Sequence, residues 1–195
     1  RVLLASGFGA AANRAPAVVK GASFYLFCHD DVYLEPNTVS ALVAEAFRSN
    51  AGVVGPKFVD WDEPEMLLDV GRAIDKFAFP APVTEPGELD QAQHDAVRDT
   101  FSVNGATMLV RADLFEAVDG FPSDFSAYEE DTDLCWRVHL AGARVIVTSD
   151  AVVRHLHAAS TGEGSPVFQH YVERNRLLML AKDAPRDLAW HAVWR

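Results

Sequence analysis

The chain has 195 residues, 49% of them hydrophobic and 23% charged, with a formal net charge of −11. This length and composition suit one globular domain with a sizeable core. The negative charge argues against a nucleic-acid partner, because contacts with phosphates need an excess of Lys and Arg. No run is long and apolar enough to span a membrane. Both cysteines, Cys28 and Cys135, lie in apolar stretches, so we expect reduced core residues of a cytosolic protein rather than a disulfide.

The first residues of the chain have some features of a signal peptide. A basic first residue and small apolar residues are typical of a signal peptide, but Gly7, Gly9 and Asn13 interrupt the apolar region that such a peptide needs. We therefore reject a signal peptide. The chain begins at Arg1 without an initiator methionine, so we expect it to be part of a longer protein.

Strands and helices are predicted to alternate in the first third of the chain. The elements are a strand at 1–4, a turn and small-residue helix at 6–15, a strand at 22–28, a helix at 35–50 and a strand at 51–59. The run at 22–28 is continuously apolar, as in a strand buried on both faces of a parallel sheet. For the helix at 35–50 we expect an N-cap at Asn37 or Thr38, with inward side chains from Val39, Leu42, Val43 and Phe47. This alternation predicts a doubly wound α/β domain.

Residues 60–100 break the alternation. The segment is acidic, contains four prolines and is too long for a plain connection. Loops of this length are usually functional, so an acceptor-binding loop or lid is one interpretation and a surface excursion without function is the other. The later predicted elements are a strand at 101–110, a helix at 111–118, a helix from 128 that closes at Gly142, one or two strands within 143–157, and a helix at 165–185 ended by Pro185.

The stretch YEEDTDLCWR, residues 128–137, gathers acids at a predicted helix start. On a helix, Asp131 falls in the middle of the stripe that faces the core, which is formed by Leu134, Cys135 and Val138. Burying a carboxylate without a partner is costly. We therefore expect Asp131 to have a function.

The other acids of this stretch are predicted to face water. Glu129 and Glu130 are explained well by a favourable interaction with the helix dipole. Asp133 can pair on the outer face with Arg137, four residues further on.

The stretch His29-Asp30-Asp31 stands where a predicted buried strand ends. In open α/β sheets, ligands bind outside the carboxyl ends of the strands. Adjacent carboxylates repel each other unless a cation lies beside them, and Mg²⁺ or Mn²⁺ suits such oxygen ligands. A solvated turn is the alternative interpretation.

Two histidines, His155 and His157, follow the last predicted strands. On a strand, residues i and i+2 share a face, so both could point toward one ligand. Each could also be structural, as single histidines often are. An acid cluster, an inward acid and a histidine pair in one α/β domain together favour a metal-assisted reaction.

Six stretches match the motif order of a known family. They are HDDVYLEP, VVGPKFV, VNGATMLVRADLFEAVDGF, YEEDTDLCWRVHLAGARVIV, VVRHLHAAS and RNRLLML. From about residue 10 to residue 182 the chain resembles glycosyltransferase family 2, the inverting nucleotide-sugar transferases of the GT-A fold. The resemblance implies a GT-A-type, Rossmann-like fold, with a doubly wound, mostly parallel sheet flanked by helices.

The resemblance also implies a reaction: transfer of a sugar from a nucleoside-diphosphate sugar to an acceptor hydroxyl, with inversion. The implied catalytic residues are Asp131, as general base, and Glu130. The implied metal ligands are Asp31, His155 (with His157 as second choice) and His29. The implied donor-binding residues are Asp30, Asp31, Arg174 and Asn175. For Arg174-Asn175 the role stays open between the diphosphate, the acceptor and the fold. The implied cofactor is Mg²⁺ or Mn²⁺.

Acceptors in this family are often glycans or lipid-linked sugars. The resemblance therefore implies a cytoplasmic location for the domain, with the parent protein at the inner face of the plasma membrane.

The chain also departs from the family pattern. Family members usually open with an apolar strand and a Thr-Tyr-Asn-like turn that grips the nucleobase, and nothing similar precedes Arg1. The fold is therefore expected to be N-terminally truncated: either the chain is an excised part of a longer enzyme, or it has lost the nucleotide pocket. A non-catalytic relative that binds carbohydrate or a partner is the alternative function. A metal-dependent hydrolase fits less well, because such sites usually gather more His and Asp ligands.

Overall fold

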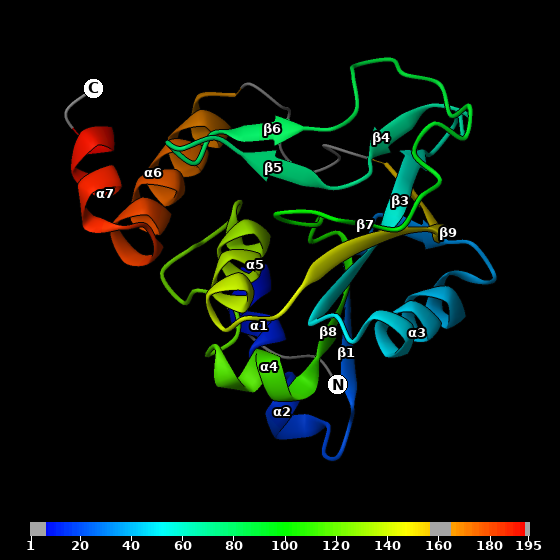
Figure 1. Ribbon diagram of the computed structural model, residues 1–195, viewed down its shortest axis with the longest axis horizontal. Coiled ribbons are helices and arrows are strands. Elements are labelled where there is room, and N and C mark those ends of the chain that lie inside the picture. The colour runs from blue at the N-terminus through cyan, green and yellow to red at the C-terminus, as the bar shows by residue number, and fades with distance from the viewer. Residues whose placement is uncertain (1–6, 157–164, 194–195) are drawn as a thin grey trace.

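The computed structural model describes residues 7–156 and 165–193 (Figure 1). The predicted strand at 1–4 and His157 lie outside these residues. The elements are α1 (Phe8–Ala12), α2 (Ala15–Val18), β1 (Phe24–Cys28), β2 (Val32–Leu34), α3 (Thr38–Ser49), β3 (Val53–Asp60), β4 (Leu67–Asp69), β5 (Arg72–Ile74), β6 (Pro80–Pro82), β7 (Arg98–Asp99), β8 (Thr107–Arg111), α4 (Ala112–Ala117), α5 (Glu130–Leu140), β9 (Val145–His155), α6 (Pro166–Asp183) and α7 (Arg186–Val193).

The main sheet is mixed, with the order β1-β8-β3-β9-β2 and with β4 and β7 attached to β3 and β9. Among the paired strands that the structure describes, only β3 and β9 run parallel; the other pairs are antiparallel. The prediction of a mostly parallel sheet is therefore wrong. An apolar run such as that of β1 shows only that both faces are covered, and an antiparallel neighbour such as β8 satisfies its backbone equally well.

Helices cover both faces of the sheet, as the alternation predicted. On one face, Val53, Val145 and Met108 pack against α4 and α5, and on the other Val54 and Ile146 pack against α3. Figure 1 shows α4 and α5 on one side of the strands and α3 on the other. Successive side chains of a strand point to opposite faces, which is why neighbouring β3 valines serve two different cores.

Helix α3 contacts the sheet through a narrower face than the sequence predicted. Leu42 is fully buried, but Val39 and Phe47 are 47% and 70% exposed. Phe47 instead packs on the ring of Phe24, with centroids 5.3 Å apart, at the open side of β1. Asn37 is the N-cap, although its side chain makes no capping hydrogen bond.

The segment 60–100 contains β4 to β7, of which β4 and β7 join the main sheet and β5 and β6 form a separate hairpin. The buried Lys57 of β3 anchors it, because its Nζ atom lies 2.6 Å from Asp90 and 2.7 Å from Asp95. Its β5–β6 hairpin lies against α6 in Figure 1. There Arg176 donates a hydrogen bond of 2.6 Å to the carbonyl of Phe77. Whether the segment binds an acceptor stays a prediction.

Several smaller predictions are confirmed. Gly142, just beyond the end of α5, has a φ of 81°, the left-handed conformation expected of a residue that ends a helix. Helix α6 ends at Asp183, before Pro185. Cys28 and Cys135 are free thiols. None of the described helices is long and apolar enough to cross a membrane.

Candidate functional site

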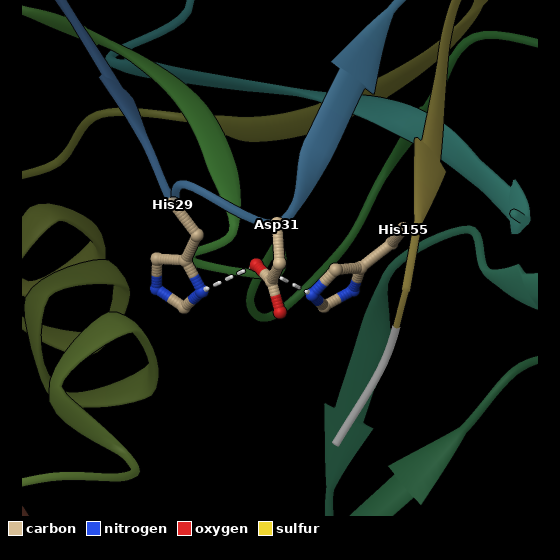
Figure 2. A group of neighbouring side chains, drawn as sticks. All are labelled: His29, Asp31 and His155. Atoms are coloured by element: carbon tan, nitrogen blue, oxygen red, sulfur yellow. Dashed lines mark ion pairs between the residues drawn. The ribbon is translucent and has the colours of Figure 1, made fainter. Parts of the chain in front are cut away.

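His155, at the end of β9, meets His29 and Asp31 at the end of β1, although it lies far from them in the sequence (Figure 2). Oδ1 of Asp31 lies 3.9 Å from Nδ1 of His29 and 3.4 Å from Nε2 of His155. Strand pairing produces this meeting, because β2 and β9 pair with Val32 opposite His155. The ring of Phe8 packs edge-on against His29, with centroids 4.8 Å apart, and so helps to orient the imidazole.

The chemistry of this cluster fits a divalent cation. The candidate ligand atoms of His29, Asp31 and His155 all lie within 4.8 Å of one another. Oδ1 of Asp31 is buried and accepts no hydrogen bond from the described residues. Ligands about 2.1 Å from one ion, at right angles to each other, lie about 3 Å apart, close to the spacing of Asp31 and His155. One carboxylate and two imidazoles are donors that suit Mn²⁺ and related ions.

Asp30, the neighbouring acid, is exposed and does not belong to this cluster. Its predicted contact with the donor stays a prediction.

Asp131 points inward, as the helical spacing predicted. It lies in the first turn of α5, is 9% exposed, and its Oδ2 accepts a hydrogen bond of 2.7 Å from the backbone N–H of Gly105. Its Oδ1 accepts one of 2.7 Å from the N–H of Thr132. A Cβ at position 105 would lie 3.1 Å from Cβ of Asp131, so a glycine leaves the room that the acid needs. The carboxylate is thus held on both oxygens.

Asp131 and the cluster of His29, Asp31 and His155, called the cation cluster below, are both hydrogen-bonded to the same short segment. Gly105 donates to Asp131, while the next residue, Ala106, accepts a hydrogen bond of 2.9 Å from the backbone N–H of His29. Residues 104–106 therefore connect Asp131 on α5 with the end of β1. Asn104 braces this segment, because its Oδ1 accepts a hydrogen bond of 2.9 Å from the N–H of Ala106.

The acids near Asp131 are less exposed than the sequence predicted. Glu129 and Glu130 are half-buried, and burial, followed by the charge of Asp131, raises the pKa of each to about 7. Asp133 is fully buried, so its predicted place on an outer face is wrong. Its pairing with Arg137 is confirmed, with Nε 2.7 Å from Oδ2.

Helix packing explains the burial of Asp133. Helix α6 covers the second face of α5, and Nζ of Lys182 on α6 lies 3.3 Å from Oδ1 of Asp133. The hydrophobic pattern of one helix predicts which of its sides faces the sheet. It does not predict which side contacts a second helix that lies further along the chain.

The sequence interpretation missed a second charged group near Asp131. Nε of Arg72 lies 2.7 Å from Oδ2 of Asp69, and the amide of Asn104 donates to the same oxygen at 3.5 Å. Burial alone would lower the pKa of Arg72, but the charges of Asp69 and Asp131 raise it above its ordinary value. The Asn-Gly pair before β8 is a turn signal that could have pointed to Asn104. Asp69 and Arg72 carry no such signal.

Arg174 and Asn175 lie on α6 and contact the loop that leads into α5. Nδ2 of Asn175 donates hydrogen bonds of 2.8 Å to the carbonyls of Ala127 and Tyr128. Nη1 of Arg174 donates to the carbonyl of Asp124 at 3.1 Å. Neither residue is part of the His29–Asp31–His155 cluster. Of the roles that the sequence left open, these contacts favour one in the fold.

Comparison with known proteins decides the family. A family model described as glycosyltransferase like family 2 matches residues 3–176. The chain belongs to this family. The resemblance to glycosyltransferase family 2 found in the sequence is thereby confirmed.

Curated relatives of this family 2 domain are distant and longer. The O-antigen biosynthesis protein RfbC of Myxococcus xanthus is 26% identical over 77% of this chain and 12% of its own length. The N-acetylglucosaminyl-diphospho-decaprenol L-rhamnosyltransferase of Mycobacterium tuberculosis is 26% identical over 80% of this chain and 57% of its own. The chain thus spans between about an eighth and three fifths of these relatives.

Solved structures support the fold. GalNAc-T7, solved with UDP, GalNAc and Mn²⁺, superposes with a TM-score of 0.66 at 13% identity, over 90% of this chain and 34% of its own. TarS residues 1–349 of S. aureus, in complex with UDP-GlcNAc, superposes with a TM-score of 0.55 at 17% identity, over 96% of this chain and 52% of its own. The family 2 domain therefore has an α/β architecture like that of GT-A glycosyltransferases, built on a mixed sheet.

Proposed function

We propose that this domain transfers a sugar from a nucleoside-diphosphate sugar to an acceptor hydroxyl with inversion of configuration. In this proposal Asp131 is the general base, and a divalent ion, Mg²⁺ or Mn²⁺, binds the donor diphosphate. Membership of family 2 supports the reaction class. The observation that carries the assignment of residues is the shared segment 104–106, which joins Asp131 to the cation cluster.

The hydrogen bonds of Asp131 are compatible with a role as general base. Each carboxylate oxygen accepts a short hydrogen bond from a backbone N–H, which leaves further lone pairs to accept the proton of an acceptor hydroxyl. As that oxygen attacks the anomeric carbon, the nucleoside diphosphate departs from the opposite face, and the configuration inverts. Glu130 is proposed as a second acid of the site, because it is half-buried beside Asp131 and that charge helps to raise its pKa.

The donor side of the site is proposed to lie at the end of β1. Asp31, His155 and His29 would hold the cation, and Asp30 would lie on the donor side of them. A bound divalent ion would neutralise the charge that develops on the departing phosphates. His155 would contribute to the cation site from a buried position, being 6% exposed.

The acceptor is proposed to be a glycan or a lipid-linked sugar. A relative from M. tuberculosis is named for a lipid-linked acceptor, which supports this class. The segment 60–100 is proposed as the acceptor side, because its residue Arg72 lies close enough to Asp131 for their charges to interact. With such an acceptor, the parent protein would work in the cytoplasm at the inner face of the plasma membrane.

The test uses the full-length parent protein and a panel of UDP-, dTDP- and GDP-sugars. Calorimetry measures the binding of UDP, dTDP and GDP with and without Mn²⁺, and chromatography then follows sugar transfer to a lipid-linked or oligosaccharide acceptor. We expect metal-dependent binding of at least one nucleotide and transfer that EDTA abolishes. Metal-independent transfer would contradict the role of the cation. If none of the three nucleotides binds to the parent protein, the result would support the alternative, a carbohydrate- or partner-binding relative without a nucleotide pocket.

A further inference from the structure

The turn that leads into α5 holds two consecutive residues in a strained conformation. Tyr128 and Glu129 have φ angles of 67° and 65°. Residues with a Cβ rarely adopt this left-handed region, and they stay there only where the surrounding structure holds them. Helix α5 begins at the next residue, Glu130, and Asp131 lies in its first turn, so the direction in which α5 begins depends on the turn that precedes it.

The side-chain amide of Asn175 holds the turn. The residue lies on α6 and is fully buried. Its Nδ2 donates hydrogen bonds of 2.8 Å to the carbonyls of Ala127 and Tyr128, and its Oδ1 accepts one of 2.7 Å from Nη1 of Arg174. The two amide hydrogens and the acceptor oxygen are thus all bonded to protein. To donate a hydrogen bond to a phosphate of the donor nucleotide, the amide would have to give up one of its bonds to Ala127 or Tyr128.

We infer that Asn175 is a positioning residue for Asp131. By fixing the carbonyls of Ala127 and Tyr128, it keeps the turn left-handed and so places the Asp131 carboxylate against the N–H of Gly105. The catalytic consequence rests on the proposed function, whereas the structural link between Asn175 and the Asp131–Gly105 hydrogen bond can be tested without any substrate.

The substrate-free test is amide hydrogen exchange of N175A. Loss of the two hydrogen bonds lets the turn relax, so we expect the N–H of Gly105 to exchange about tenfold faster or more, while the amides of β3 and β9 keep their protection. N37A is the matched control, because Asn37 is exposed and its side chain makes no capping hydrogen bond. Unchanged protection at Gly105, or an equal loss throughout the sheet, would overturn the inference.

The catalytic test compares kcat with KM. With whichever nucleotide sugar supports transfer, N175A is expected to lower kcat about tenfold or more, because misplacing a catalytic group by about 1 Å is that costly. The affinity for the nucleotide with Mn²⁺ and the KM for the donor should change less than about twofold. A raised KM with kcat intact would show that Asn175 contacts the donor, and would overturn the inference. If the protein transfers no sugar at all, the proposed function fails and the exchange result still decides the positioning role.

A second variant covers the case in which N175A does not fold. Glycine adopts a positive φ at little cost, so Tyr128→Gly should relieve the strain that Asn175 otherwise opposes. We expect the double variant Y128G/N175A to fold and to regain protection at Gly105. A double variant that stays unfolded, or that folds with Gly105 unprotected, would show that Asn175 supports the fold in some other way.

Discussion

Nε2 of His155 lies 3.4 Å from Oδ1 of Asp31, although the two residues lie far apart in the sequence. The pairing of β2 with β9 brings them together, because Val32 stands opposite His155 in the register. A shift of one residue in this register would turn the imidazole to the other face of the sheet. The cation cluster is therefore a consequence of how the edge of the sheet is assembled.

The first prediction concerns this cluster. H155A should lower the affinity for Mn²⁺ in the presence of nucleotide by tenfold or more, because it removes the proposed buried nitrogen ligand. Calorimetry or the Mn²⁺ paramagnetic resonance signal measures the change. H170A is the matched control, since His170 is exposed on α6 and lies outside the cluster. Equal Mn²⁺ affinities in both variants would rule out His155 as a ligand.

The second prediction concerns Gly105. In G105A the new methyl group would lie 3.1 Å from Cβ of Asp131 and push the carboxylate away from the backbone N–H. We expect kcat to fall by roughly 10–100-fold with little change in nucleotide affinity, because the proposed role of Asp131 is to act on the acceptor rather than on the donor. Steady-state kinetics and nucleotide calorimetry on the same preparation measure both. An unchanged kcat would mean that Asp131 does not need its bond to Gly105.

The position of Asp131 could be predicted from the sequence, whereas that of Asp133 could not. Asp131 faces the sheet, and the stripe of Leu134, Cys135 and Val138 marks that side of the helix in the local sequence. Asp133 faces α6, which lies more than thirty residues further along the chain, and no local pattern encodes that contact. In the same way, the polar contacts of Arg72 and Asp69 could not be predicted, because no sequence pattern indicates how the segment 60–100 folds.

In the sheet, the positions of the strands could be predicted from the sequence, whereas their directions could not. The strands β1, β3 and β9 are each marked by apolar runs, and the structure places strands there. Their directions depend on the connections between them, and periodicity does not reveal these connections. The acids that follow the predicted buried strand and the histidine pair favour a metal-assisted reaction from the residues alone. The specific set of Asp31, His155 and His29 is implied only by the resemblance to family 2.

The third prediction concerns pH and stability. Burial, followed by the charge of Asp133, raises the pKa of Asp183 from 3.8 to about 6. The folded state therefore holds a proton that the unfolded state has lost, so this group destabilises the fold as the pH rises from about 4 to 6, and fully above that. D183N should raise the unfolding free energy by about 1 kcal/mol at pH 7.5, a value reduced for the partial exposure of Asp183.

The control for this prediction is D150N, which changes an exposed aspartate. Thermal unfolding at pH 7.5 and at pH 4 measures both variants. The gain of D183N should disappear at pH 4, where the aspartate is protonated in the folded state of the wild type. A gain of equal size at both pH values would show that the raised pKa is not its cause.

The fourth prediction concerns the anchor of the segment 60–100. K57M removes the ammonium group that lies 2.6 Å from Asp90 and 2.7 Å from Asp95, and leaves two acids without their partner. We expect a loss of about 1–3 kcal/mol in unfolding free energy and faster proteolysis within residues 88–96. Chemical denaturation and mass spectrometry of the fragments measure the two effects. K76M, at an exposed lysine of the same segment, should change neither.

The proposed role of Asp131 as general base is tested most directly by the rate of sugar transfer by D131N in the full-length parent protein, measured with Mn²⁺ and donor at saturation. Asparagine keeps the shape of the side chain but cannot accept the proton, so the rate should fall by about 10²–10⁴-fold while calorimetry shows an unaltered affinity for the nucleotide with Mn²⁺. Transfer at the wild-type rate by a folded D131N protein would show that Asp131 is not the general base.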